Sequence, residues 1–421
     1  MQQQSKASVR RFFQDLGPGL ITGAADDDPS GIATYSVTGA SLGYGPLWTA
    51  LFSFPLMAAV QLMCARLGMV TGRGLAAVIR RHFPPWVLWG ACALLAIANL
   101  INIGADLGGM ADATEMLTGV SSLVWTPLYA VAIVAMLIWS SYRRIARIFK
   151  WLTLVLFAYV LAAFLARPDW TAVLRSTFLP HVEFSRAWLA VFVALLGTSI
   201  SPYLFFWQAA EEVEEERAQG RKTAAMRKGA TREELRKSRA DVVAGMALSN
   251  LIMYFIIMTT AATLHAHGVN KVETARQAAE ALRPMAGNAA YLLFTLGIVG
   301  TGVLAVPVLA GSCAYAIAEA RGWAASLEHP PKIAGKFYLV LGMAVLLGTC
   351  LDYFGLNAVK MLFFSAVING VLAPPLIFIL VLLTSNRKVM GEHVNPPVLR
   401  WLGWTTGFVM LAAAVAMFAA G

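Results

Sequence analysis

The stretch Gly23–Gly31 places three consecutive carboxylates, Asp26–Asp28, inside the first apolar segment of the chain. A charge in hydrocarbon costs about 3 kcal/mol or more, so such residues normally face a cavity or a partner. Pro29 follows directly and interrupts a helix, and irregular backbone at membrane depth is tolerated only where it lines a cavity. The stretch therefore predicts a broken helix that forms half of an ion site. The alternative is a re-entrant or interfacial turn with its aspartates in water.

The composition is that of a polytopic membrane protein. Hydrophobic residues make up 58% of the 421, charged residues 13%, and the mean hydropathy is +0.65. Residues 1–11 are predicted to be a polar cytoplasmic tail, and residues 12–421 a single transmembrane transporter domain that contacts the lipid bilayer. About eleven helical spans are expected, because one span needs roughly 20 apolar residues. They lie near 16–43, 46–70, 87–118, 123–140, 148–167, 187–210, 241–265, 288–318, 333–351, 358–384 and 398–420.

The distribution of Lys and Arg predicts the orientation. If the N-terminus is inside, cytoplasmic segments hold 25 of these residues and outer segments hold 7. This asymmetry follows the positive-inside rule, so the net charge of +10 reflects topology and not nucleic-acid binding. We expect a plasma (inner) membrane protein with a cytoplasmic N-terminus and an outside C-terminus. The long segment 211–240, which opens with Glu211–Glu216, is interpreted as a solvated, partly helical cytoplasmic loop; the alternative is an acidic lip that concentrates cations.

A second interruption lies in the sixth span, where Gly197–Tyr203 combines small polar residues with Pro202. Spans one and six each open a group of five, and an odd number of spans inverts the second group. Paired interruptions at corresponding positions of two halves are the best sequence indication of a transporter site between inverted repeats. The alternative is an ordinary proline kink.

The expected cation site is made of oxygen atoms. The last carbonyls of a half-helix lack partners and carry partial negative charge. Asp28, the carbonyls near Ala25 and Thr198, and the Ser201 hydroxyl would then surround the ion. The remaining two carboxylates cannot share one helical face with Asp28, so at least one of them is expected to line a vestibule.

Several motifs resemble the Nramp family of divalent metal transporters, over most of the chain. Asp28–Gly31 is similar to the family's Asp-Pro-Gly-Asn signature, Ala65–Arg73 matches the end of span two, and Leu383–Gly391 matches the segment after span ten. Gly197–Tyr203 falls on the family's sixth-span motif. The resemblance implies an all-α, LeuT-type fold: two inverted five-helix repeats plus an eleventh helix, with spans one and six broken.

The departures from the family pattern concern the metal ligands. In the family, the first-span aspartate and asparagine and the sixth-span methionine bind a transition metal. Asp28 is retained, whereas Gly31 and Ser201 replace the other two. Loss of the thioether removes a soft ligand, and a roomier oxygen site suits Mg²⁺, which keeps several waters. This pattern resembles the Nramp-related magnesium transporter branch.

Residues beyond the metal ligands are assigned to the vestibule or to holding water molecules. Asn369, in span ten, is a candidate for this task or alternatively a packing amide. The whole vestibule and water-holding set is Asp26, Asp27, Ser30, Ser199, Tyr203 and Asn369.

Most residues of the family's proton path are replaced in this sequence. Tyr203 stands where the family has a histidine, and Gly109 replaces one member of an acidic pair whose other member is Asp106. Asp106 is then a remnant of the proton path or a structural acid. We expect little or no proton coupling. Two charges crossing about 100 mV release roughly 4.6 kcal/mol, which sustains a gradient of order 10³.

The sequence therefore predicts a monomeric importer of partly hydrated Mg²⁺, with Mn²⁺ as a further substrate, no cofactor and alternating access. One alternative is a proton-coupled Mn²⁺/Fe²⁺ importer of the ordinary Nramp type. A second is a LeuT-type amino-acid transporter, although three aspartates would repel a substrate carboxylate. An enzyme is not expected, because the sequence has no HExxH motif and no histidine cluster within the spans.

Overall fold

The computed structural model describes residues 17–139, 154–353 and 357–420, and the regular structure in these ranges is helical. The predicted tail, residues 1–11, lies outside them. The helices are α2 (Pro18–Asp26), α3 (Pro29–Leu42), α4 (Trp48–Thr71), α5 (Leu75–His82), α6 (Pro85–Thr118), α7 (Ser122–Trp139), α9 (Phe157–Leu165), α10 (Trp170–Phe178), α11 (Arg186–Ser199), α12 (Pro202–Ala218), α13 (Arg232–Thr263), α14 (Ala275–Glu280), α15 (Arg283–Ala286), α16 (Ala290–Arg321), α17 (Pro331–Asp352), α18 (Ala358–Thr384), α19 (Arg387–Met390) and α20 (Pro397–Ala419).

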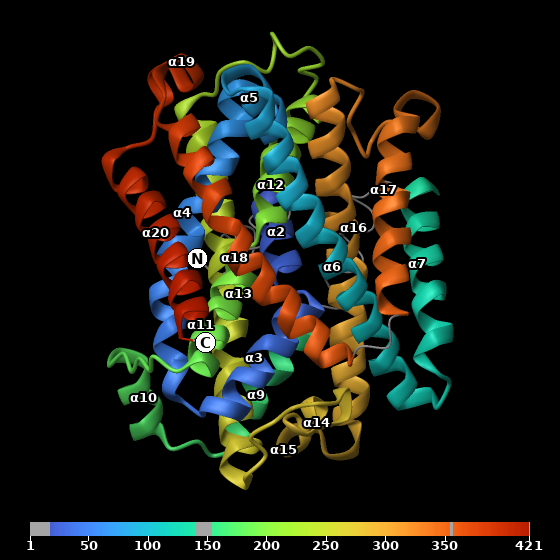
Figure 1. Ribbon diagram of the computed structural model, residues 1–421, viewed down its shortest axis with the longest axis vertical. Helices are drawn as coiled ribbons and strands as arrows, with labels where there is room; N and C mark the ends of the chain where they lie inside the picture. The colour runs from blue at the N-terminus through green and yellow to red at the C-terminus, as the bar shows by residue number, and fades with distance from the viewer. Residues whose placement is uncertain (1–16, 140–153, 354–356, 421) are drawn as a thin grey trace, which may run out of the picture.

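The helices follow the predicted spans in order (Figure 1). Within the described ranges, nine helical stretches are long and apolar enough to cross a membrane. The first predicted span falls outside this count because its break divides it into α2 and α3. The fifth does so because residues 148–153 lie outside the described ranges and leave only α9 and the short 3-10 helix before it.

Both predicted breaks are present, and both have the same local cause. Asp28 and Ser201 adopt extended backbone conformations, with ψ of 170° and 135°, and each precedes the proline that begins the next helix. A residue before proline is disfavoured in the helical region, and proline at the first helical position lacks only an N–H that would have no helical partner. The sequence therefore ends α2 and α11 and restarts the chain as α3 and α12 at the centre of the bundle.

The two halves pack in a reciprocal way. Helix α13, the seventh span, packs against both pieces of the broken first span, α2 and α3. Helix α4, the second span, packs against both pieces of the broken sixth span, α12 and α11. The second helix of each half thus supports the broken helix of the other half, as expected for inverted repeats that share one central site.

The acidic segment after span six is partly helical, as predicted, but its first carboxylates are buried and not solvated. Helix α12 continues to Ala218 and α13 begins at Arg232, so Glu211–Glu216 is helical and only residues 219–231 connect the two helices. Glu212 and Glu214 are each 4% exposed. The solvated-loop interpretation of this run was wrong, because internal partners take the place of water. Glu214 pairs with Arg217 at 2.6 Å and accepts a hydrogen bond from Ser326 at 2.8 Å.

The interface between α2 and α13 depends on glycine. Gly19 and Gly23 form a small-xxx-small pattern on α2, and a Cβ at Gly23 would overlap the backbone of Gly245 on α13. Such patterns let helix backbones approach closely in membranes. The close approach fixes the half-helix that carries Ala25 and Asp26 against α13.

We expect Gly23→Ala to destabilise the protein by about 1–3 kcal/mol, since the added methyl group overpacks a closed interface. Gly90→Ala is the matched control, because Gly90 lies in α6 with open space around it and the same change there favours the helix by about 0.5–1 kcal/mol. Thermal unfolding of the purified variants measures both. Equal melting temperatures would contradict this account of the α2–α13 contact.

Candidate cation site at the helix breaks

Asp28 is the anchor of the first break and is 3% exposed. Its Oδ1 accepts a hydrogen bond of 2.7 Å from the Gly31 amide and caps α3. Its Oδ2 accepts from Asn102 Nδ2 at 3.0 Å and from the Tyr203 hydroxyl at 3.3 Å. The carboxylate is therefore held by α3, α6 and α12 together, at the positive end of a helix dipole.

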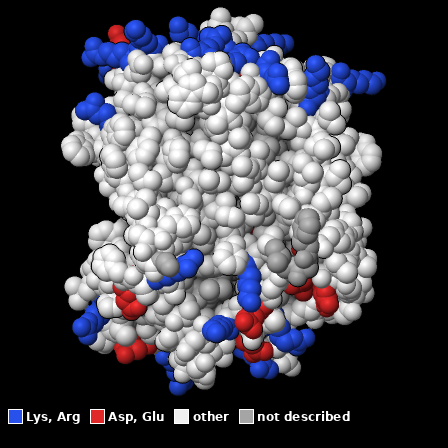
Figure 2. Space-filling model, in the orientation of Figure 1, with Lys and Arg blue, Asp and Glu red and all other residues white. Residues whose placement is uncertain are grey.

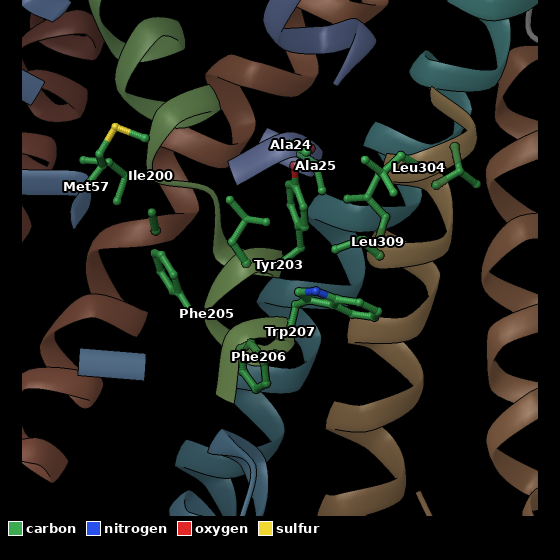
Figure 3. Packing of buried hydrophobic residues seen from close by; sticks show 14 of the residues in the cluster. Ala24, Ala25, Met57, Ile200, Tyr203, Phe205, Phe206, Trp207, Leu304 and Leu309 are labelled. Atoms are coloured by element: carbon green, nitrogen blue, oxygen red, sulfur yellow. Dashed lines mark hydrogen bonds between the residues drawn. The ribbon is translucent and has the colours of Figure 1, made fainter. Parts of the chain in front are cut away.

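Tyr203 connects the two broken spans. Its hydroxyl donates to the Ala25 carbonyl at 3.0 Å as well as approaching Asp28, and its ring points from α12 toward the end of α2 (Figure 3). Tyr203 is fully buried. The freed carbonyl predicted near Ala25 is present at the break, and the tyrosine hydroxyl is its partner. Tyr203 thus belongs to the site itself and does not line an outer vestibule.

The serine and threonine hydroxyls of the second break bond to their own chain. Ser201 Oγ lies 2.7 Å from the Gly197 carbonyl and 2.8 Å from the Thr198 carbonyl. Thr198 and Ser199 both donate to the Leu195 carbonyl at 3.0 Å. The Thr198 carbonyl was expected to be free. Instead, it shares the single hydrogen of the Ser201 hydroxyl with the Gly197 carbonyl. These three hydroxyl oxygens keep lone pairs available, but their hydrogens stabilise the end of α11.

Asp26 and Asp27 do not line an open vestibule. They are 0% and 1% exposed, and both contact the Ser249 hydroxyl of α13, at 2.6 and 3.1 Å. The expectation failed because the close approach of α13 covers this side of the break. Asp28 faces α6 and α12 instead. The separation comes from the non-helical backbone of the break and not from a helical face, because α2 ends at Asp26 and Asp28 is the extended residue before α3.

Asp106 lies against the start of α3. Its Oδ1 accepts from the Ser30 amide at 3.2 Å, whereas its buried Oδ2 has no partner. The Ser30 hydroxyl lies 2.7 Å from the Leu362 carbonyl and 2.8 Å from Ser365 Oγ, so it joins α3 to α18. Asn369 is buried one turn further along α18, and its Oδ1 is also without a partner.

Asn102 was missed by the sequence reasoning. It is fully buried on α6, it donates to Asp28, and its own Oδ1 has no partner. A signal for it was available: Asn99, Asn102 and Asp106 recur at helical spacing in an otherwise apolar span, which places polar groups on one helix face.

The chemistry of the site is that of a hard cation. Within the described residues, no group of three or more His, Cys, Asp or Glu side chains converges to hold a metal. Around Asp28 the break offers carboxylate, carbonyl, amide and hydroxyl oxygen. One thioether lies near the second break, where the Met253 sulfur of α13 is 3.4 Å from the Ser199 hydroxyl. Oxygen ligands of this kind suit hard divalent cations, and a site with one or two carboxylates leaves room for retained water.

Comparison with known proteins identifies the family. The sequence profile of the family described as "Natural resistance-associated macrophage protein-like" matches residues 19–420. The chain belongs to the Nramp family. Among its relatives, the divalent metal cation transporter MntH of Deinococcus radiodurans is 28% identical over 415 residues, covering 96% of this chain and 89% of the relative. That of Klebsiella pneumoniae is 27% identical over 410 residues, with 95% and 92% covered.

Solved structures agree on the fold. A crystal structure of the Eremococcus coleocola manganese transporter superposes with a TM-score of 0.75 at 17% identity, covering 96% of this Nramp chain and 86% of that one. The amino-acid-bound transporter MhsT superposes with a TM-score of 0.53 at 15% identity, covering 96% and 98%. These likenesses confirm the LeuT-type fold with two broken spans. Together with the family, they make this protein a multi-pass membrane transporter of divalent metal cations.

We expect Asn102→Ala to weaken divalent metal binding by about 10- to 100-fold, the usual cost of removing a side chain that orients a metal ligand. Asn99→Ala is the control, because Asn99 lies one turn away on α6 and donates to the Leu309 carbonyl instead of Asp28. Titration calorimetry with Mn²⁺ measures the affinities. Equal weakening in both variants would assign the effect to α6 packing and not to Asp28.

Proposed function

We propose that this Nramp protein imports Mg²⁺ in a partly hydrated form, by alternating access around Asp28 and with little or no proton coupling. The observation that carries the proposal is the ligand set at Asp28. Its polar neighbours are Gly31, Asn102 and Tyr203, and Ser201 stands where a thioether would favour a transition metal. Mg²⁺ gives up its waters reluctantly and is usually held through one or two carboxylates. Mn²⁺ fits the same oxygen atoms and is the second substrate.

The proposed site set follows the geometry. Asp28 is the charged ligand, Gly31 leaves volume beside it, and the oxygen atoms of Ala25, Thr198 and Ser201 lie at the adjoining helix ends. Asn102 joins the set, since its free Oδ1 lies on the side chain that holds Asp28. The remaining hydroxyls and the amide of Asn369 hold the waters of the ion.

The charge pattern supports the proposed orientation. Lys and Arg side chains crowd one end of the molecule, a broad uncharged band follows, and acidic and basic residues mix at the other end (Figure 2). The crowded end is the one where α5 and α19 lie (Figure 1). We assign it to the cytoplasm on the positive-inside rule, which places the N-terminus inside and the C-terminus outside.

Membrane potential is the proposed driving force. Two charges moving through about 100 mV release roughly 4.6 kcal/mol, so no proton is energetically required. Asp106 supports weak coupling at most, because its hydrogen bond is to the Ser30 amide and glycine occupies position 109, where the family has a second acidic residue. The second candidate is a proton-coupled Mn²⁺ importer, which the names of the MntH relatives favour.

Flux into proteoliposomes under an imposed potential, with an internal pH dye, tests the proposal. We expect Mg²⁺ entry without matching acidification, and abolished uptake in Asp28→Ala because the only charge that the ligand set supplies is gone. Asp169→Ala is the control, since that carboxylate caps the outer helix α10 and is remote from the break. Mn²⁺ entry with stoichiometric acidification and no Mg²⁺ flux would establish the second candidate instead.

Selectivity has its own test at Ser201. We expect Ser201→Met to raise Mn²⁺ and Cd²⁺ affinity relative to Mg²⁺ by about tenfold, because a soft thioether replaces a hard hydroxyl. Adding Gly31→Asn should strengthen the effect if the Asp26 carbonyl shifts slightly, since a Cβ at Gly31 would lie 3.3 Å from that oxygen and 3.4 Å from the Tyr35 ring. Competition titrations measure the ratio, with Ser53→Met on α4 as the control. An unchanged ratio would remove the selectivity argument.

A further inference from the structure

Asp26 and Asp27 form a buried polar cluster that faces α13, whereas Asp28 faces α6 and α12. Both side chains are buried, and both are directed to Ser249 of α13, at 2.6 and 3.1 Å. Asp28 instead contacts Asn102 of α6 and Tyr203 of α12. One short stretch of backbone therefore presents carboxylates to two separate surroundings.

The Asp26–Asp27 cluster lacks hydrogen-bond donors. A serine hydroxyl carries one hydrogen, so Ser249 can donate to only one of the two carboxylates at a time. Asp26 Oδ1 is buried without any partner. Buried polar atoms are nearly always satisfied, and an unsatisfied one indicates that a further group belongs there.

Tyr35 is a second, independent sign of a missing group. Its hydroxyl is fully buried and has no hydrogen bond of normal length and angle, although it lies beside Thr198 and Ser199. A Cβ added at Gly31 would lie 3.3 Å from the Asp26 carbonyl oxygen and 3.4 Å from the Tyr35 ring, so the ring lies close to the backbone of Asp26. Tyr35 thus belongs to the same buried region as the two carboxylates.

The charge balance of the centre points the same way. Four carboxylates are buried around the break, those of Asp26–Asp28 and Asp106, and none forms an ion pair with a Lys or Arg of the described residues. One divalent cation at Asp28 balances two of these charges. Burying two further charges without compensation is costly, and either protonation of Asp26 and Asp27 or a second cation relieves that cost.

We propose that Asp26, Asp27, Ser249 and Tyr35 bind a second divalent cation, so that the protein holds two ions around one helix break. Two carboxylates and two hydroxyls are a hard oxygen set, and they balance a double charge. Two divalent ions about 3.5–4 Å apart are known in the two-metal sites of phosphatases, polymerases and nucleases. The proposal rests on the proposed function only in taking a divalent cation as the ligand.

Mn²⁺ is the probe, because it can be counted and is paramagnetic. Equilibrium dialysis of the purified full-length protein should give two Mn²⁺ per chain for the wild type and one for Asp28→Ala. EPR of the wild type should show signals broadened by a neighbouring Mn²⁺, and Asp28→Ala should restore the narrow signal of an isolated ion. One ion in the wild type and none in Asp28→Ala would overturn the proposal.

The proposed second cation site is tested directly by the double variant Asp26→Asn with Asp27→Asn, which keeps the side-chain shapes and removes the charge. We expect one Mn²⁺ and loss of the broadening, with Ser249→Ala weakening the same ion by about tenfold or more and Ser53→Ala leaving both ions in place. Two ions retained in the double variant would refute the assignment. If the double variant does not fold, the wild-type and Asp28→Ala counts decide. These experiments measure binding and not transport. A lack of Mg²⁺ flux would therefore disprove the proposed function without affecting the two-ion proposal.

Discussion

The structure depends on keeping carboxylates inside a membrane without a basic partner. Asp28 is held by the amide of Gly31, the amide group of Asn102 and the hydroxyl of Tyr203. Dipoles of this kind stabilise a carboxylate while leaving it able to bind a cation, whereas an arginine would neutralise it permanently. The need to supply them explains why the helix breaks where it does, why α6 carries asparagine at its centre, and why the two broken spans approach each other.

The same requirement links the site to the packing of the bundle. Tyr203 reaches Ala25 and Asp28 only because α12 starts beside the end of α2, and that position depends on α13 approaching through Gly23 and Gly245. Each half of the fold contributes one broken helix and one helix that supports the other half's break. A movement of one half relative to the other would change the distances at Asp28 first, which is what alternating access requires.

Much of this could be predicted from the chain. The order of the helices and both breaks follow from apolar periodicity and proline positions. The burial of Glu211–Glu216 could not be predicted, because the charge density of this run is typical of a solvated segment and its burial depends on tertiary partners such as Ser326. The open vestibule predicted for Asp26 and Asp27 failed for the related reason that α13 covers them.

The sequence by itself determined the membrane class, the two interruptions and the hard character of the ligands, because hydropathy, proline and side-chain chemistry are local properties. The tertiary structure decided which oxygen atoms converge. Ser249 and Tyr203 lie more than 170 residues from the aspartates that they contact, and no local pattern encodes such a distance. Asn102 lies between these cases: its helical face could be predicted from spacing, but its bond to Asp28 arises only where α6 packs against the break.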